Sequence, residues 1–255
     1  MYNMEITILT IFPEMFVSPF SESIIKRAQE KELVNIKILD IRDFTKDKHR
    51  SVDDYSYGGG PGMVLKPEPI IEAMEHLRNE QKIGLNSKII ISSAQGKKFN
   101  QKIAKILSIH ANLVFICGRY EGIDERVSRL LKAEELSIGD YVMTGGEIPV
   151  MVMVDVIIRM IPGVLGKEES MINDSFYNGL LDYPHFTRPE KYKGHEVPGV
   201  LLSGNHKKIE IWRKKQSLLE TMIRRPDLLV DRKFSKEEMK IINDLKTDKK
   251  EKRGK

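Results

Sequence analysis

Three glycine-bearing loops contain the residues of this chain that are best suited to holding a small ligand. They are Gln95-Gly96, Gly118–Gly122 and Gly145-Gly146, and each comes directly after a short apolar run. Glycine has no Cβ, so its backbone reaches positive φ values and its amide groups stay open to a ligand. Taken one at a time, each loop is explained at least as well by a tight turn.

Side chains that could do chemistry lie further along the chain. Asp155 and Arg159 stand at i and i+4, a spacing that by itself favours a buried ion pair or a helix-end arginine. Residues 173–189 (NDSFYNGLLDYPHFTRP) bring carboxylates, a histidine and an arginine together with aromatic residues. Aromatic rings stack on bases and arginine binds phosphates, so this segment suits a nucleic-acid partner.

A further loop, Gly58–Gly62 (GGGPG), has four glycines in five positions. Its bare backbone could hold a phosphate or a ribose, and a flexible surface loop explains it equally well. No Gly-Lys-Ser/Thr follows, so it is not a Walker loop.

The elements that must position these residues alternate between strand and helix. Apolar runs rich in β-branched residues predict strands at 5–12, 34–41, 88–93 and 112–117, and a short one at Tyr141–Met143. Helical stripes separate most of them, which predicts an α/β fold with a parallel sheet. The carboxyl ends of parallel strands share one edge, so the three glycine loops are expected to converge on one pocket.

The C-terminal third has a different character. Residues 1–165 hold 21 Lys+Arg against 22 Asp+Glu, and residues 166–255 hold 21 against 15, so the basic excess lies after the break Pro162–Ser170. A basic module of this kind suits a polyanion, and a solvated lysine-rich surface is the equally good alternative. Asn205 is expected to cap a helix from His206 to Arg225, and Ser235–Glu238 has the capping-box pattern.

Composition excludes several classes of protein. A single cysteine, Cys117, rules out a disulfide framework within the chain and fits a reducing compartment. The N-terminus lacks signal-peptide features, and the longest apolar run, 148–161, is too short to cross a bilayer. A cytoplasmic protein without a membrane span is therefore predicted. The spacing of the histidines predicts no zinc site.

Seven segments together resemble one family, the bacterial tRNA (guanine-N1)-methyltransferases of the SPOUT class. The resemblance runs in order from about residue 5 to about residue 244. Its segments are GGGPGM (58–63), CGRYEGIDERV (117–127), SIGDYVMTGGEIP (137–149), PGVLG (162–166), DSF (174–176), GLLDYPHFTRP (179–189) and LLSGNHKKIEIWR (201–213).

The resemblance implies a fold that the pattern of residues does not reveal. It implies a SPOUT-type, mostly parallel sheet with a deep C-terminal trefoil knot, followed by a small α-helical domain. The expected limits are a domain that binds S-adenosylmethionine at 1–165, a linker at 166–178, a helical tRNA-binding domain at 179–246 and a basic, disordered tail at 247–255.

The resemblance also implies S-adenosylmethionine as methyl donor, bound in the knot chiefly by backbone groups. Ala94 departs from the proline common in the family, which removes some stiffness from the first loop. The residues expected to contact the cofactor are Ser92, Gln95, Gly96, Gly118, Tyr120, Glu121, Gly122, Ile138, Gly139, Asp140, Tyr141, Val142, Met143, Gly145 and Gly146.

Two residues match the family's catalytic positions: Asp174 its general base and Arg159 the partner that stabilises charge on guanine O6. The substrate implied is tRNA with guanosine at position 37, and the assembly implied is a homodimer with shared active sites. Mg²⁺ is linked to the family, but no ligand cluster for it is evident. The residues expected to contact tRNA are Gly59, Gly60, Ser170, Asp182, His185, Arg188, Lys207, Arg213 and Lys214.

Two alternatives remain open at this point. One is an RNA-binding or regulatory protein with a SPOUT body and no transfer activity. The other is a SPOUT enzyme that methylates ribose or ribosomal RNA. The intact Asp174, Arg159 and glycine loops argue against the first, and the HFTRP and SGNH segments argue against the second.

Overall fold

The computed structural model describes residues 3–80, 82–84, 86–166 and 174–253, with 246 and 248–253 in backbone only. The chain divides into two compact units, Met1–Glu168 and Glu169–Lys255, which are described separately. The finer limits at 165, 178 and 246 stay predictions.

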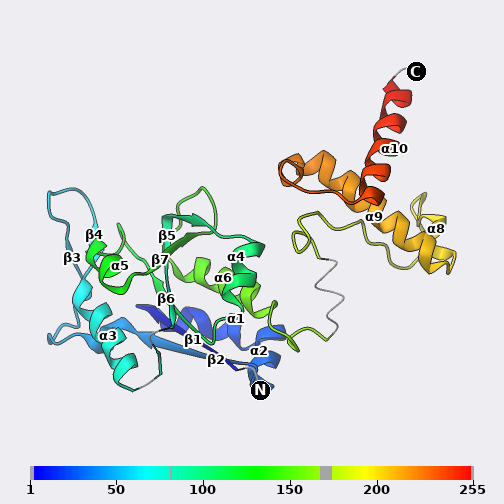
Figure 1. The fold of residues 1–255 in the computed structure, drawn as a ribbon. Coiled ribbons are helices and arrows are strands. Elements are labelled where there is room, and N and C mark those ends of the chain that lie inside the picture. Colours follow the sequence, from blue (N-terminus) through cyan, green and yellow to red (C-terminus); the bar gives the residue numbers. More distant parts are fainter. Residues whose placement is uncertain (1–2, 81, 85, 167–173, 254–255) are drawn as a thin grey trace. The chain divides into compact units, whose positions relative to one another are not determined.

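The first unit is built on a five-stranded sheet in the order β2-β1-β6-β5-β7 (Figure 1). Every neighbouring pair in it is parallel, as the alternation of strand and helix predicts. The strands are β1 (Met4–Thr10), β2 (Val34–Asp40), β5 (Lys88–Lys98), β6 (Asn112–Cys117) and β7 (Glu134–Ser137).

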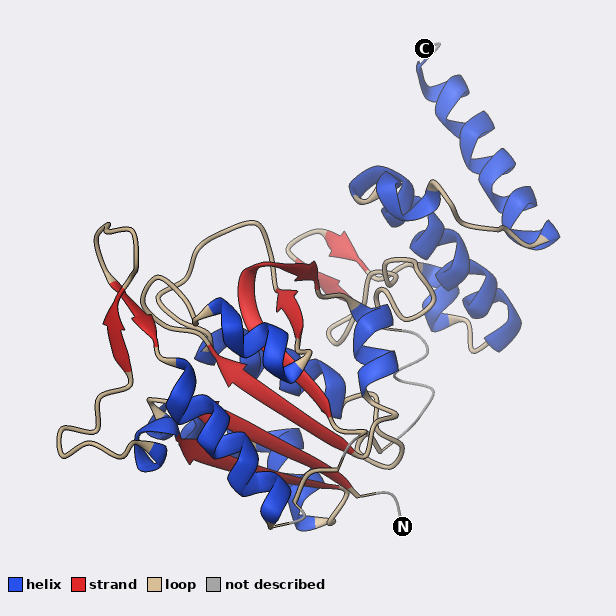
Figure 2. Ribbon diagram, turned by 60° about the vertical axis from the view of Figure 1, so that its left-hand side comes forward, coloured by secondary structure: helices blue, strands red, loops and turns tan. Residues whose placement is uncertain are grey.

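Helices cover both faces of this sheet (Figure 2). One group consists of α2 (Ser23–Glu30), α4 (Gln101–Leu107) and α6 (Glu147–Ile158), with α6 in contact with the other two. The second group consists of α3 (Pro67–Asn79) and α5 (Glu125–Leu131), which contact each other. Short elements complete the unit: η1 (Pro13–Phe16), α1 (Val17–Phe20) and η2 (Ile41–Phe44).

Burial on both faces explains why the strands are apolar throughout. In β6, Val114 and Ile116 join the core cluster beneath α3 and α5, whereas Phe115 belongs to the opposite face and is also fully buried. A parallel sheet covered on both sides needs such continuous apolar runs. The α/β prediction is therefore confirmed, while the trefoil knot stays a prediction.

One predicted strand is wrong. Tyr141–Met143 is irregular, and the last strand of the sheet is instead β7, which ends at Ser137. Val142 is 90% exposed and Tyr141 is 58% exposed, so these apolar side chains do not mark a buried strand. The prediction was wrong because these apolar residues line a pocket at the surface and not the core.

A two-stranded antiparallel hairpin stands apart from the main sheet. It joins β3 (Asp53–Tyr55) to β4 (Met63–Leu65), with the glycine-rich loop as its connection. Gly58, Gly59, Gly60 and Gly62 all have positive φ, between +78° and +119°. The backbone of this connection therefore suits glycine at each of the four positions.

The second unit is mainly helical. Its elements are β8 (Lys191–Tyr192), β9 (His195–Glu196), α8 (Gly199–Leu202), α9 (His206–Arg224), η3 (Pro226–Leu229) and α10 (Lys236–Arg253). A small core of Leu218, Ile242 and Leu245 joins α9 to α10. The two strands form a short antiparallel hairpin.

Local capping signals are confirmed in this unit. The Asn205 side chain accepts a hydrogen bond from the Lys208 amide at 3.1 Å at the start of α9. At α10 the Ser235 hydroxyl accepts from the Glu238 amide at 3.1 Å, and the Glu238 carboxylate accepts from the Ser235 amide at 2.8 Å. Helix α10 continues to Arg253, into the predicted tail, because Lys, Glu and Arg are good helix formers.

Candidate functional site

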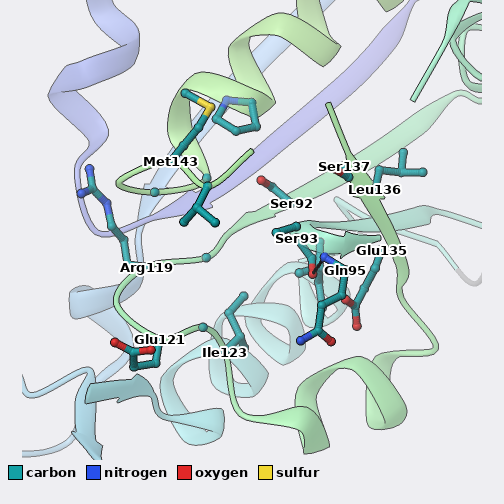
Figure 3. Close-up of a pocket in the computed structure, with 18 of the residues that line it drawn as sticks. Ser92, Ser93, Gln95, Arg119, Glu121, Ile123, Glu135, Leu136, Ser137 and Met143 are labelled. Atoms are coloured by element: carbon teal, nitrogen blue, oxygen red, sulfur yellow. Dashed lines mark hydrogen bonds between the residues drawn. The ribbon is translucent and has the colours of Figure 1, made fainter. Parts of the chain in front are cut away.

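A pocket of about 320 Å³ lies at the carboxyl edge of the first unit's sheet. Its walls are the segments that follow β6 and β7 and a detour within β5, so the predicted convergence of three glycine loops is confirmed. Figure 3 shows side chains from these three segments facing one hollow. Ligands of open α/β sheets bind in such a place.

Thirteen of the fifteen residues predicted to bind a cofactor line this pocket. They are Ser92, Gln95, Gly118, Tyr120, Glu121, Gly122, Ile138, Gly139, Tyr141, Val142, Met143, Gly145 and Gly146. Sequence reasoning about single residues missed several further lining residues, among them Ile123, Asp124, Glu125, Ser128, Glu135, Leu136 and Ser137. Most of these lie on helix or strand ends, where no glycine signal marks them.

The other two predicted residues do not line the pocket. The Asp140 side chain is 89% exposed and pairs with Lys98 at 3.2 Å. A Cβ on Gly96 would lie 2.5 Å from the backbone of Glu135 and Leu136. Gly96 is therefore required for strand packing, which explains the glycine without any ligand.

Strand β5 makes room for the pocket by an irregularity. Ser92 and Lys97 both pair with Leu136 of β7, so the four residues between them leave the ladder. Ser93, Ala94 and Gln95 of this detour line the pocket. A bulge of this kind re-aims backbone and side chains next to a binding site.

The loops after β6 and before α6 touch through their backbones. The Gly146 amide donates to the Gly118 carbonyl at 2.7 Å. A Cβ on Gly146 would lie 2.7 Å from the Gly118 nitrogen and 2.9 Å from the Cys117 Cα. Gly146 has an ordinary φ of −82°, so close approach is the reason for glycine here.

A buried ion pair joins the same two loops. No sequence pattern predicted this pair. Arg119 Nε donates to Glu147 Oε2 at 3.0 Å, and Glu147 is only 1% exposed. The Thr10 hydroxyl at the end of β1 donates to the other carboxylate oxygen at 2.9 Å. Arg119 also donates to the Thr144 carbonyl at 3.0 Å and lies over the Phe12 ring.

This network joins three parts of the first unit. Arg119 is itself one of the residues that line the pocket, and in Figure 3 its side chain points away from Ser92, Ser93 and Gln95. Glu147 is not among the residues that the sequence predicts to bind a ligand or to react. The sequence does contain one signal of a buried charge here, because the Glu147 carboxylate comes directly before a long, almost wholly apolar run.

Cys117 lies beside this network and is buried. Burial raises the pKa of the Cys117 thiol well above its usual range, and the nearby Glu147 carboxylate adds to the effect. The residue is therefore a neutral thiol at physiological pH, without the thiolate character that reactive cysteines need.

The loop that carries Glu121 is also tied to the glycine-rich hairpin. The Glu121 amide donates to the Met63 carbonyl at 3.0 Å, and the Leu65 amide donates to the Gly122 carbonyl at 3.0 Å. A Cβ on Gly62 would lie 2.5 Å from the Glu121 carboxylate. Strand β4 therefore positions Glu121, while Gly59 and Gly60 lie in open space in the hairpin connection.

The two predicted catalytic residues belong to different units. Arg159 is the C-cap residue of α6, and its amide donates to the Asp155 carbonyl at 3.2 Å. Asp174 is partly buried at the start of the second unit, and its carbonyl accepts from the Tyr177 amide at 3.3 Å. Their roles stay predictions.

Three of the predicted tRNA contacts gather in the second unit. Asp182 Oδ2 lies 2.8 Å from His185 Nε2, and the His185 ring is tilted against the Tyr183 ring with 4.8 Å between the ring centroids. The Arg213 guanidinium lies 5.0 Å from the centre of the same Tyr183 ring. His185 and Arg213 thus both contact the Tyr183 ring, and Asp182 pairs with His185.

The other predicted tRNA contacts do not join that cluster. Lys214 pairs with Glu237 at 3.0 Å, whereas Arg188 and Lys207 are exposed. Ser170 lies outside the described residues. Trp212 is half-buried, and the centre of its ring lies 6.3 Å from that of Phe186.

No group of three or more His, Cys, Asp and Glu side chains that could hold a metal ion occurs among the described residues. Within the same residues, no helix is both long enough and apolar enough to cross a membrane.

Fold and pocket together define a class: an α/β protein with a small-molecule site at the carboxyl edge of a parallel sheet, followed by a helical unit. Comparison with known proteins makes this specific. Residues 4–231 match the family model described as tRNA (Guanine-1)-methyltransferase TrmD, so the chain belongs to this family.

Curated relatives agree with that assignment. The chain is 57% identical to the tRNA (guanine-N(1)-)-methyltransferase of Carboxydothermus hydrogenoformans over 94% of this chain and 92% of the relative. It is 55% identical to the same-named protein of Desulforamulus reducens over 95% of both chains. For that of Bacillus cereus strain G9842 the identity is 51%, over 96% of this chain and all of the relative.

Proposed function

We propose that this protein transfers a methyl group from S-adenosylmethionine to N1 of the guanine at position 37 of tRNA, next to the anticodon. The observation that carries the proposal is the pocket of a tRNA (guanine-1)-methyltransferase family member, lined by thirteen of the fifteen residues that the family resemblance assigns to the cofactor.

The pocket residues fit such a cofactor. Main-chain groups of the two loops that line the pocket, Gly118–Gly122 and Ile138–Met143, can offer amides and carbonyls to a flat base. Tyr141 and Val142 supply exposed apolar surface. The Glu121 carboxylate, beside the wall of the pocket, suits the cationic amino group of the methyl donor.

The cofactor supplies an activated methyl group, so the protein's work is on the guanine. N1 carries a proton that must leave before its electron pair can form the new bond to carbon. We assign Asp174 to accept that proton as general base. We assign Arg159 to stabilise the negative charge that develops on O6. Neither step needs a metal ion, and we assign no role to Mg²⁺.

The second unit is proposed to hold tRNA. Its excess of basic residues suits phosphates, and Tyr183, in contact with His185 and Arg213, offers an aromatic and cationic surface. The target guanosine has to leave its stack to reach the pocket. The remaining proposed tRNA contacts are Gly59, Gly60, Ser170, Asp182, Arg188, Lys207 and Lys214.

We further propose a homodimer in which each active site takes residues from both protomers. Exposed apolar side chains near the N-terminal end of α6 and on adjacent segments support this: Val17 is 56% exposed, Ile148 44% and Val152 41%. Helix α6 contacts η1, so these residues belong to neighbouring segments. Because its proposed substrate is tRNA, we also propose that the protein acts in the cytoplasm.

Mass spectrometry tests the activity directly. Unmodified tRNA with guanosine at position 37 is incubated with the protein and S-adenosylmethionine, digested and analysed. Methyl on guanine N1 at position 37 supports the proposal. Methyl on ribose, methyl elsewhere in the RNA, or no methyl at all would each contradict it.

The shared site is tested by mixing two inactive variants. Asp174→Ala lacks the proposed base, and Gly118→Leu blocks the proposed cofactor pocket. Hybrid dimers contain one site with both defects and one with neither, so part of the activity should return. Absence of any rescue, with mixed dimers demonstrated, would argue for sites within single protomers.

A further inference from the structure

The turn that carries Asp174 has an unusual backbone. The Gly179 amide donates to the Phe176 carbonyl at 3.1 Å, and the Phe176 amide donates to the Leu180 carbonyl at 2.7 Å. Phe176 has a left-handed φ of +72°. A bulky residue keeps such a conformation only where its surroundings hold it, so the anchors of this turn matter.

Helix α9 provides one anchor, after the turn. The Leu181 amide donates to the Thr221 hydroxyl at 2.9 Å, and the Ser217 hydroxyl donates to the Leu181 carbonyl. Thr221 is fully buried. The chain is therefore fixed where the turn ends.

Arg232 provides a second anchor, within the turn itself. Its Nη1 donates to the Asn178 carbonyl, and its Nη2 donates to Glu238 Oε1 at 3.0 Å. Glu238 is the carboxylate of the α10 capping box and is 8% exposed. One planar guanidinium thus joins the Asp174 turn to the first residues of α10, across 54 positions of sequence.

Two details indicate a fitted contact. A Cβ on Gly179 would lie 3.2 Å from Arg232 Nη1, so the glycine leaves the space that the guanidinium occupies. Arg232 Nε is buried and has no hydrogen-bond partner among the described residues. A buried donor without a partner is unfavourable, so the fork is oriented toward Asn178 and Glu238 at some cost.

We propose that Arg232 is a positioning residue for methyl transfer, which sets the place of Asp174 by tying its turn to α10. The inference rests on the proposed function, because it needs Asp174 as the base. The proposed role requires no contact between Arg232 and either reactant. It lies one residue beyond the segment that matches the family model.

The test compares single-turnover methylation rates of Arg232→Met and the unaltered protein across pH. Methionine keeps much of the apolar stem and removes both donors. At neutral pH we expect a loss of about tenfold, as small misplacements of a catalytic group typically cause, with KM for both substrates nearly unchanged. At alkaline pH guanine N1 loses its proton to solvent, so the deficit should shrink.

The outcomes separate the alternatives. A rate equal to that of the unaltered protein at both pH values, or an equal deficit at both, would overturn the inference. Arg224→Met is the matched control, since Arg224 is exposed and pairs with Glu220 on its own helix. If Arg232→Met does not fold, Arg232→Lys replaces it, because lysine keeps the charge and one donor contact. If neither variant folds, the role of Arg232 is purely structural and the inference is overturned.

Asp174→Ala, measured beside them, separates this inference from the proposed function. A fully active Asp174→Ala would refute the base assignment itself. An inactive Asp174→Ala together with a fully active Arg232→Met would refute only the role of Arg232.

Discussion

The cofactor pocket and the Asp174 segment are built in opposite ways. The pocket is lined by loops that a buried ion pair joins, and at Gly96, Gly145 and Gly146 an added Cβ would come within 3 Å of neighbouring atoms. The segment from Asp174 to His185 is irregular, and its chemistry lies in side chains anchored by a few hydrogen bonds.

The difference matches the two tasks. We propose that backbone groups recognise the methyl donor, and such recognition needs a rigid, preorganised wall, which the core of the first unit supplies. A large RNA that must be bound and released suits exposed side chains on loops. Substitutions in the pocket should therefore disturb folding and binding together, whereas those in the Asp174 segment should remove chemistry and leave the fold intact.

The largest effect on catalysis is expected for Asp174→Ala. Loss of the proposed general base should lower the methyl-transfer rate by about 10²–10⁴-fold. Cofactor affinity, tRNA affinity and melting temperature should barely change. Rapid-quench assays and calorimetry measure these quantities, with the exposed Asp244→Ala as control. A large fall in melting temperature would erase the contrast between the two regions.

Glu147→Ala should instead act through stability. It leaves Arg119 without its carboxylate partner in a mostly buried place, which typically costs about 3–5 kcal/mol of unfolding free energy. Denaturant titration measures the loss. Glu125→Ala is the control, since its pair with Arg129 is exposed and such pairs contribute about 0–1 kcal/mol. Equal effects of the two substitutions would show that the pocket lacks a stabilising network.

Gly146→Ala tests whether the walls require bare backbone. The new methyl group would press on Gly118 and Cys117, and overpacking of this kind costs about 1–3 kcal/mol. Affinity for S-adenosylmethionine should fall with stability, as isothermal titration calorimetry can measure. Gly84→Ala, where nothing lies within 4 Å of the added Cβ, should behave like the unaltered protein. Unchanged affinity in Gly146→Ala would indicate that the loops can move apart.

The smallest effect is expected for Lys207→Gln in the second unit. Removing one phosphate contact should weaken tRNA binding modestly and reduce the salt slope of log K by about 1. Filter binding over a series of salt concentrations measures that slope. Lys102→Gln, an exposed lysine of the first unit, is the control. An identical change in both variants would point to a general charge effect rather than a tRNA contact.

Local pattern was sufficient for much of the first unit. Strands β1, β2, β5 and β6 follow from their apolar runs, and their parallel arrangement follows from the helices between them. The caps at Asn205 and Ser235 follow from neighbouring residues. These features depend on interactions only a few positions apart, which a sequence displays directly.

Two of the predictions that failed concern an apolar segment that does not belong to the core and a glycine that does not face the pocket. Tyr141–Met143 is apolar because it lines a hollow, so it imitates a strand. Gly96 is a glycine because β7 presses on it, so it imitates a ligand contact. An apolar residue can line a surface pocket or a buried strand, and a glycine can face a ligand or a packed neighbour. Only the packing in the folded protein decides which of the two applies.

By itself, the sequence determined the order of elements, the edge on which three glycine loops meet and the family to which the chain belongs. Only the tertiary structure decided which charges meet: Arg119 with Glu147 and Thr10, and Arg232 with Asn178 and Glu238. Periodicity records the burial of apolar faces, whereas the partner of a charge depends on which distant segments the packed fold brings within hydrogen-bond distance.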